Sequence, residues 1–152
     1  MPSTEVTKKH INRVRELLYE ACAKIAARAV RHDASKFDPI EKGPLDEMQR
    51  LIDAEGQAPY GSEEYRRRTA LLGPMLEHHY ANNSHHPEHY ENGVDGMDLF
   101  DVLEMFFDWK AASERGGEST IGLSHSVKRF GISPQLESIL QNTADRLGYE
   151  TN

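Results

Sequence analysis

The sequence lacks a second cysteine, so its single cysteine, Cys22, cannot form a disulfide within the chain. A lone cysteine is typical of proteins that stay in a reducing compartment. The first ten residues, MPSTEVTKKH, also lack the apolar core of a secretory signal. Together these absences predict a cytoplasmic location.

Long apolar runs and an excess of positive charge are also missing. No stretch approaches the roughly 20 apolar residues of a membrane-spanning helix, so we expect no membrane association. The 18 basic residues are outnumbered by 25 acidic ones, giving a formal net charge of −7. General nucleic-acid binding needs a basic surface and is therefore not expected. A small phosphorylated substrate is still compatible with this composition, because a local basic pocket or a metal ion can outweigh the net negative charge of the chain.

Helical periodicity is present throughout. Apolar residues recur at spacings of three and four from about Thr4 to Arg31, and a second such segment covers Pro44 to Ala54. Ser62 is placed to cap a third helix that runs to about His79 and is kinked at Pro74.

The second half of the chain begins with an irregular connection, Tyr80 to Gly96, rich in Asn, His, Pro and Gly. A fourth helix is expected from Asp98, its cap, to about Glu114, with Asp101 completing an aspartate version of the capping box. A short helix is expected at about Ser124 to Phe130. The last helix is bounded by Ser133 and Gly148.

No stretch shows the period-two alternation of a half-buried strand. A chain of 152 residues with 38% hydrophobic residues is also long enough to bury a core of its own. The prediction is an all-α fold, a single compact domain of about five to six helices over residues 1–152.

The histidines are the anomaly of the composition. The chain has eight, and five of them lie between residues 78 and 89. Imidazole and carboxylate are the common ligands of catalytic divalent metals, and mixed nitrogen and oxygen sets suit Fe, Mn, Zn and related ions. The candidate ligands are His10, His32, Asp33, His78, His79, His85, His86 and Asp108.

Ordinary structural explanations exist for these histidines and stay open. His10 on an apolar stripe is typical of a core or boundary residue. His32 suits the end of a helix, where positive charge is favoured. His78 and His79 point about 100° apart on a helix, so we expect only one to coordinate. His79 is preferred because it shares the stripe of Leu76.

Asp108 stands among phenylalanines and a tryptophan on the fourth predicted helix. A carboxylate among aromatic rings needs a compensating cation, so we expect Asp108 to bind metal. Glu104, one turn earlier, is placed to orient a ligand histidine or to act as a general base. The alternative is that both belong to a solvated acidic stripe that starts at Asp101. Lys36, three residues after Asp33, is a candidate phosphate contact, or else a solvated turn residue.

The order of these residues in an all-helical chain resembles the HD-domain superfamily of metal-dependent phosphohydrolases. The stretch His32-Asp33-Ala34-Ser35-Lys36 is similar to the superfamily's His-Asp-x-Gly-Lys form, with serine in place of glycine. The combination of HDASKF, HHYANNSHHPEHY and LEMFFDWKA is similar to an uncharacterised family of small HD-like proteins. That family occurs in bacteriophages and bacteria and is described as a domain of unknown function. The resemblance covers roughly His10 to Ala112.

The resemblance implies a metal site with one or two divalent ions, among Mn, Fe, Co, Ni, Zn and Mg. It implies hydrolysis of a nucleotide or another small phosphate ester, in a bacterial cytoplasm or that of a phage's host. Alternatives are an HD-like di-iron oxygenase and a non-catalytic metal-containing module that binds a nucleotide or a protein. The implied ligands are His10, His32, Asp33, His79, His86 and Asp108. The implied catalytic residues are Lys36, Glu104 and Asp108.

One spacing conflicts with that ligand set. His10 and His32 are 22 residues apart, which is about 33 Å along an unbroken helix. Either the chain forms a hairpin near Ala21, or His10 belongs to a site in another subunit. The second alternative predicts a homodimer with shared helices.

Overall fold

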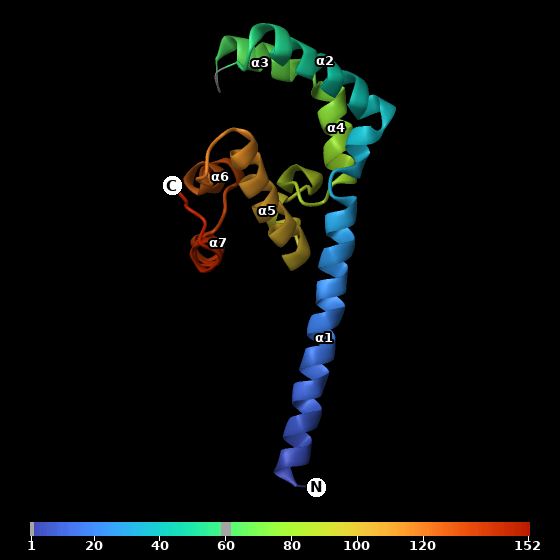
Figure 1. Ribbon diagram of the computed structural model, residues 1–152, viewed down its shortest axis with the longest axis vertical. Helices are drawn as coiled ribbons and strands as arrows, with labels where there is room; N and C mark the ends of the chain where they lie inside the picture. Colours follow the sequence, from blue (N-terminus) through green and yellow to red (C-terminus); the bar gives the residue numbers. More distant parts are fainter. Residues whose placement is uncertain (1, 59–61) are drawn as a thin grey trace. The chain divides into compact units, whose positions relative to one another are not determined.

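A computed structural model describes residues 2–58 and 62–152 (Figure 1). The chain divides into two units, Met1–His32 and Asp33–Asn152. The described residues form seven α-helices and three short 3-10 helices, with one isolated β-bridge between Ile121 and Thr151. The prediction of an all-α fold is confirmed. The expectation of one domain over residues 1–152 stays a prediction.

The first unit is a single helix, α1 (Ser3–Arg31), of 29 residues. It contains neither glycine nor proline, so nothing in its sequence breaks the hydrogen-bond ladder. The hairpin considered near Ala21 is therefore wrong. His10 and His32 lie about 33 Å apart along this axis, so they cannot bind the same ion within one chain. A site in which His10 comes from a second copy stays a prediction.

The second unit opens with a turn at Asp33, the 3-10 helix η1 (Ala34–Phe37) and helix α2 (Pro39–Glu55). The predicted start of α2 at Pro44 is wrong by five residues, because Pro39 occupies the first helical position. A proline there loses no helical hydrogen bond, since the first amide groups of a helix have no partner within it. Pro44 is instead accommodated inside the helix.

The helix expected from Ser62 to His79 is two helices, α3 (Glu63–Ala70) and α4 (Gly73–Asn82). Pro74 lies in the first turn of α4, where its missing N–H is harmless, and the chain breaks just before it. This break explains why the described residues hold one helix more than expected. The cap at Ser62 is confirmed, since its Oγ accepts the Tyr65 amide at 3.0 Å.

The irregular connection after α4 contains two 3-10 helices, η2 (Pro87–His89) and η3 (Gly93–Gly96). It leads to α5 (Leu99–Arg115), where the predicted capping box of Asp98 and Asp101 is present. Asp101 is only 2% exposed and also accepts hydrogen bonds from Ser84 and Tyr90, each at 2.6 Å. The solvated-stripe explanation is thus wrong for Asp101, which ties the connection to α5.

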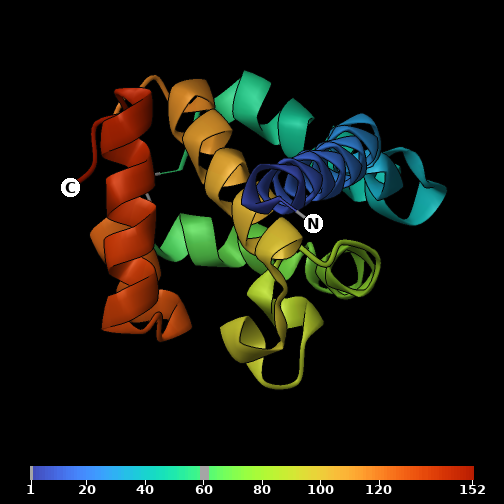
Figure 2. The same cartoon turned by 90° about the horizontal axis from the view of Figure 1, so that it is seen from below.

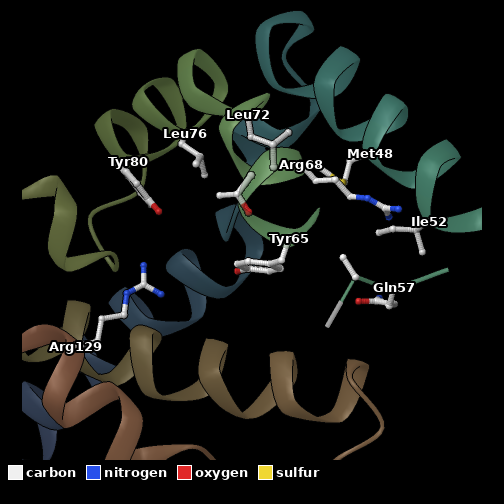
Figure 3. Close-up of a pocket in the computed structure, with 11 residues that line it drawn as sticks. Met48, Ile52, Gln57, Tyr65, Arg68, Leu72, Leu76, Tyr80 and Arg129 are labelled. Atoms are coloured by element: carbon white, nitrogen blue, oxygen red, sulfur yellow. The ribbon is translucent and has the colours of Figure 1, made fainter. Parts of the chain in front are cut away.

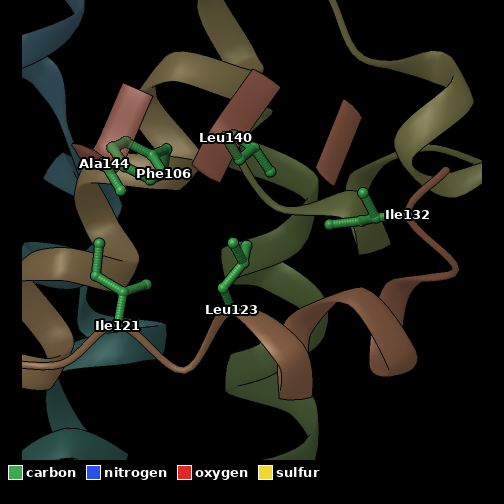
Figure 4. Close-up of a cluster of buried hydrophobic side chains, with 6 residues drawn as sticks. All are labelled: Phe106, Ile121, Leu123, Ile132, Leu140 and Ala144. Carbon is green, nitrogen blue, oxygen red and sulfur yellow. The ribbon is translucent and has the colours of Figure 1, made fainter. Parts of the chain in front are cut away.

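The hydrophobic core of the second unit gathers around α5 and the two C-terminal helices, α6 (Leu123–Phe130) and α7 (Pro134–Leu147). Helices α6 and α7 lie side by side (Figure 2). Trp109 of α5 stacks on Phe130 of α6 with ring centroids 6.0 Å apart. No helix among the described residues is both long and apolar enough to cross a bilayer. Figure 4 shows the buried cluster, formed by Phe106, Ile121, Leu123, Ile132, Leu140 and Ala144.

Candidate metal centre

Side chains from three stretches of the second unit converge at one place. Asp33 precedes η1, His79 lies on α4, His85 and His86 follow α4, and Asp108 lies on α5. One ligand atom from each of Asp33, His79 and His86 lies within 4.8 Å of the other two. The same holds for His85, His86 and Asp108, so His86 belongs to both groups.

The separations between these donor atoms are those expected around a cation. His79 Nε2 lies 2.9 Å from His86 Nε2 and 3.4 Å from Asp33 Oδ1. His85 Nε2 lies 3.5 Å from the same Asp33 oxygen. Ligand atoms bonded to one metal at about 2.1 Å are separated by about 3.0 Å at right angles and about 3.4 Å at tetrahedral angles. The geometry therefore fits a coordination shell.

Glu41 of α2 orients His79 from behind. Its side chain is fully buried, and Oε2 accepts from His79 Nδ1 at 2.8 Å while Oε1 accepts from His78 Nδ1 at 2.7 Å. Burial raises the pKa of Glu41, but hydrogen bonds from His78, Ser35 and His79 outweigh it and hold the pKa below its usual value. The charged carboxylate keeps the proton on His79 Nδ1, which leaves the Nε2 lone pair facing the centre.

Asn83 supports the same arrangement at the end of α4. Its side-chain nitrogen donates to Ser35 Oγ at 2.7 Å and to the His79 carbonyl at 2.8 Å. That nitrogen also lies 3.2 Å from His79 Nδ1. Both of its hydrogens are already used, so this third contact does not compete with Glu41 for the His79 tautomer.

Glu104 has the corresponding position behind His85. The His85 ring is 2% exposed, and its Nδ1 lies 3.1 Å from Glu104 Oε1. A carboxylate at Nδ1 again directs the Nε2 lone pair away from itself, toward Asp33. This contact fits the orienting role expected for Glu104.

His86 is held in its neutral form. Burial, together with the neighbouring His85 and His79, lowers its pKa to about 4 against the opposing effect of Asp108 and Asp33. A neutral imidazole is the form that binds metal. The short distance between His79 Nε2 and His86 Nε2 is favourable when either a proton or a cation lies between the two nitrogens.

Asp33 has an unusual backbone. Its φ of 54° is the only positive value at a non-glycine position among the described residues. Aspartate tolerates this left-handed conformation better than most residues. Lys36 Nζ lies 2.5 Å from Asp33 Oδ2, with the lysine side chain partly exposed. The positively charged ammonium group of Lys36 thus lies at the edge of the candidate centre.

Within the second unit the structure brings together the residues expected there and adds some that were not. His85 is at the centre together with His86, whereas the sequence resemblance implies only His86. His78 points to Glu41, which fits the preference for His79. The roles of His10 and His32, which belong to the first unit, stay predictions. The expected residues that meet are Asp33, Lys36, His79, His86, Glu104 and Asp108.

Glu41 is a residue of the candidate centre that the sequence pattern does not indicate. Because the sequence predicts that α2 begins at Pro44, Glu41 is expected in a turn, where nothing indicates that it contacts a histidine. Pro39 preceded by Asp38 is a helix-start pattern that would have extended α2 to include it.

Changing Glu41 to glutamine is expected to lower metal affinity by about 10- to 100-fold. Glutamine has only one acceptor oxygen for the two histidines, and its amide favours the wrong His79 tautomer. Competition with a chelating dye measures the affinity. Glu47→Gln, at an exposed position of the same helix, is the matched control and should bind as the unchanged protein does. Equal affinities in the two variants would contradict the orienting role.

The metal-free protein is expected to become less stable as the pH falls from 6.5 to about 4. His86 has a pKa of about 4 when folded, against an ordinary 6.5. The unfolded chain therefore binds more protons in this range, and stability rises with pH across it. Thermal melting at a series of pH values tests this. His86→Gln should flatten the dependence while His89→Gln should not, and identical curves would refute the assignment.

The chemistry of the centre is that of a mixed imidazole and carboxylate site. Such a set suits Fe, Mn, Co, Ni or Zn better than Mg, which prefers oxygen ligands. Two overlapping ligand groups sharing His86 leave room for one or two ions.

Comparisons with known proteins place the chain in a family without assigning it an activity. No curated protein and no solved structure matches it. The comparisons also give no link to the HD-domain superfamily, which stays a resemblance in sequence pattern. A family model described as "Family of unknown function (DUF5662)" matches residues 2–146. Because this match covers nearly the whole length, the chain belongs to the DUF5662 family of unknown function.

Proposed function

We propose that this protein is a metal-dependent phosphohydrolase that acts on a nucleotide or another small phosphate ester. The observation that carries the proposal is the convergence of Asp33, His79, His85, His86 and Asp108 in the second unit. When bound there, a divalent cation supplies a Lewis acid for the phosphate and lowers the pKa of a water molecule toward about 7.

The surrounding side chains have complementary roles in this proposal. Lys36, at the rim beside Asp33, neutralises negative charge on the phosphate. Glu104 holds His85 in its ligand orientation. Asp108 binds metal or accepts a proton from the attacking water. His32 is proposed as a further ligand.

His10 is proposed as a ligand contributed by a second copy of the chain. The unbroken α1 separates His10 from His32 within one copy, so a homodimer with shared helices is the arrangement that admits both.

The resemblance to HD-domain proteins supports the same function. The serine that replaces the glycine of the superfamily motif, Ser35, accepts a hydrogen bond from Asn83 and also interacts with Glu41. It thereby joins the residues that hold His79. The departure from the motif is therefore compatible with an intact centre.

The test is phosphate release from a panel of nucleotides and ring-free phosphate esters. Protein stripped of metal is reloaded separately with Mn, Co, Ni, Mg or Fe. Release with at least one metal, lost in Asp108→Ala, is expected. No release with any metal would refute the proposal. Tightly held iron with oxygen-dependent turnover would instead favour the di-iron oxygenase, and metal binding without turnover a non-catalytic module.

A further inference from the structure

A pocket of about 350 Å³ lies in the second unit (Figure 3). It is formed by residues of α2, α3 and α4 together with Gln57, Ala58 and Leu72, with Arg129 of α6 at one side. Its volume falls within the range of small-molecule binding sites, roughly 300 to 1,000 Å³. None of the residues assigned above to the metal centre lines it.

The walls of this pocket are mainly apolar and aromatic. Met48, Ile52 and Leu72 contribute aliphatic surface, and Tyr65 and Tyr80 contribute phenol rings. Figure 3 shows these side chains directed into a common space. Phenol rings offer a face for stacking, and aliphatic side chains exclude water, so the lining suits a flat ring.

Arg68 lines the pocket but is already committed to structure. It is 5% exposed and donates to Glu64 at 2.6 Å, to Glu55 at 2.8 Å and to the Gly56 carbonyl at 2.9 Å. The two carboxylates offset the positive charge of the guanidinium, so Arg68 does not make the pocket an anion site. Shape and apolar surface are its main selective features.

Tyr80 joins the pocket to the metal centre. Its ring lines the pocket and lies 5.2 Å, between centroids, from the His86 ring. Arg129 faces the Tyr80 hydroxyl and pairs at 2.9 Å with Glu88, two residues after His86. The segment that supplies the histidine ligands is therefore in contact with one wall of the pocket.

We infer that this pocket is a subsite for a flat aromatic or heteroaromatic ring in the alcohol part of the substrate. It selects phosphate esters that carry such a ring over ring-free sugar or glycerol phosphates. The inference rests on the proposed function only in its claim that the ring belongs to a phosphate ester. Binding of the ring by itself requires neither metal nor turnover.

The test measures binding of phosphate-free rings to the full-length protein by calorimetry. The probes are adenosine, guanosine, cytidine, uridine and 4-nitrophenol, which separate nucleobases from simple aromatic rings. At least one should bind saturably. Leu72→Trp, which fills the pocket, should weaken that binding at least ten-fold. Leu71→Trp is the matched control, because Leu71 is 58% exposed and lies outside the lining, so binding should stay within two-fold.

Three results would overturn the inference. They are no saturable binding of any ring, equal binding by the two tryptophan variants, and equal kcat/KM for nucleotides and ribose 5-phosphate. Should Leu72→Trp melt below the assay temperature, Met48→Trp fills the same space from α2 and decides the outcome in its place. Ring binding without phosphate release from any ester would reject the proposed function and leave the subsite standing.

Discussion

Replacing His79 by alanine is expected to remove most of the metal that copurifies with the protein. His79 Nε2 is within 3.4 Å of both His86 Nε2 and Asp33 Oδ1, and Glu41 fixes its orientation. Loss of a residue that hydrogen-bonds to a ligand lowers metal affinity by up to about 100-fold, and loss of the ligand itself should lower the affinity at least as much. Elemental analysis of protein purified without chelators or added metal measures the effect.

The matched control is His89→Ala. His89 lies in the same histidine-rich stretch, is exposed, and uses its Nδ1 on the Tyr80 carbonyl at 2.7 Å. Its loss should leave metal content unchanged. Two results would contradict the candidate centre. The first is that the protein without substitutions purifies without metal, and the second is that the two variants contain equal amounts of metal.

Replacing Phe106 by alanine is expected to lower the free energy of unfolding by about 3–5 kcal/mol. Phe106 is 1% exposed and stacks on Tyr149 with ring centroids 6.3 Å apart. Truncation removes these contacts and leaves a cavity among side chains of α5, α6 and α7. Because domains of this size are stable by only about 5–15 kcal/mol, the loss is large and urea denaturation will show it.

Phe107→Ala supplies the comparison. This neighbouring phenylalanine is 40% exposed, so less apolar surface is lost and a smaller decrease is expected. Similar decreases for the two variants would show that the core does not centre on Phe106. Since Glu104 and Asp108 share α5 with Phe106, metal affinity should fall in Phe106→Ala as well.

Helix ends with a local chemical signal were predictable from the sequence. The Asp98–Asp101 capping box and the Ser133 cap of α7 occur as expected, because each depends only on residues within one turn. The errors fell on prolines. The sequence pattern predicts a helix start at Pro44 and a kink at Pro74, although a proline is also compatible with a helix interior or with the first turn of a new helix. Packing of α2 against α4 decides between these outcomes, and it is not a local property.

Several ligand residues of the candidate centre were predictable from the sequence. The inward-facing histidines after α4 and the residue that orients His79 were not fully predictable. Residue type and order indicated Asp33, His79 and Asp108 as ligands. Which of His85 and His86 faces inward depends on the backbone of a non-helical turn, where neighbouring side chains follow no fixed angle, and both face inward. Glu41 acts through His79 from a helix 38 residues earlier, a relation that no sequence spacing encodes.

The backbone of Asp33 limits how this centre can be redesigned. Asparagine and glycine accept a left-handed conformation but carry no charge, and glutamate carries the charge but adopts that conformation less readily. Aspartate alone meets both demands well. An engineer who wishes to alter metal preference should therefore keep position 33 and vary the imidazoles, whose backbones lie in ordinary regions.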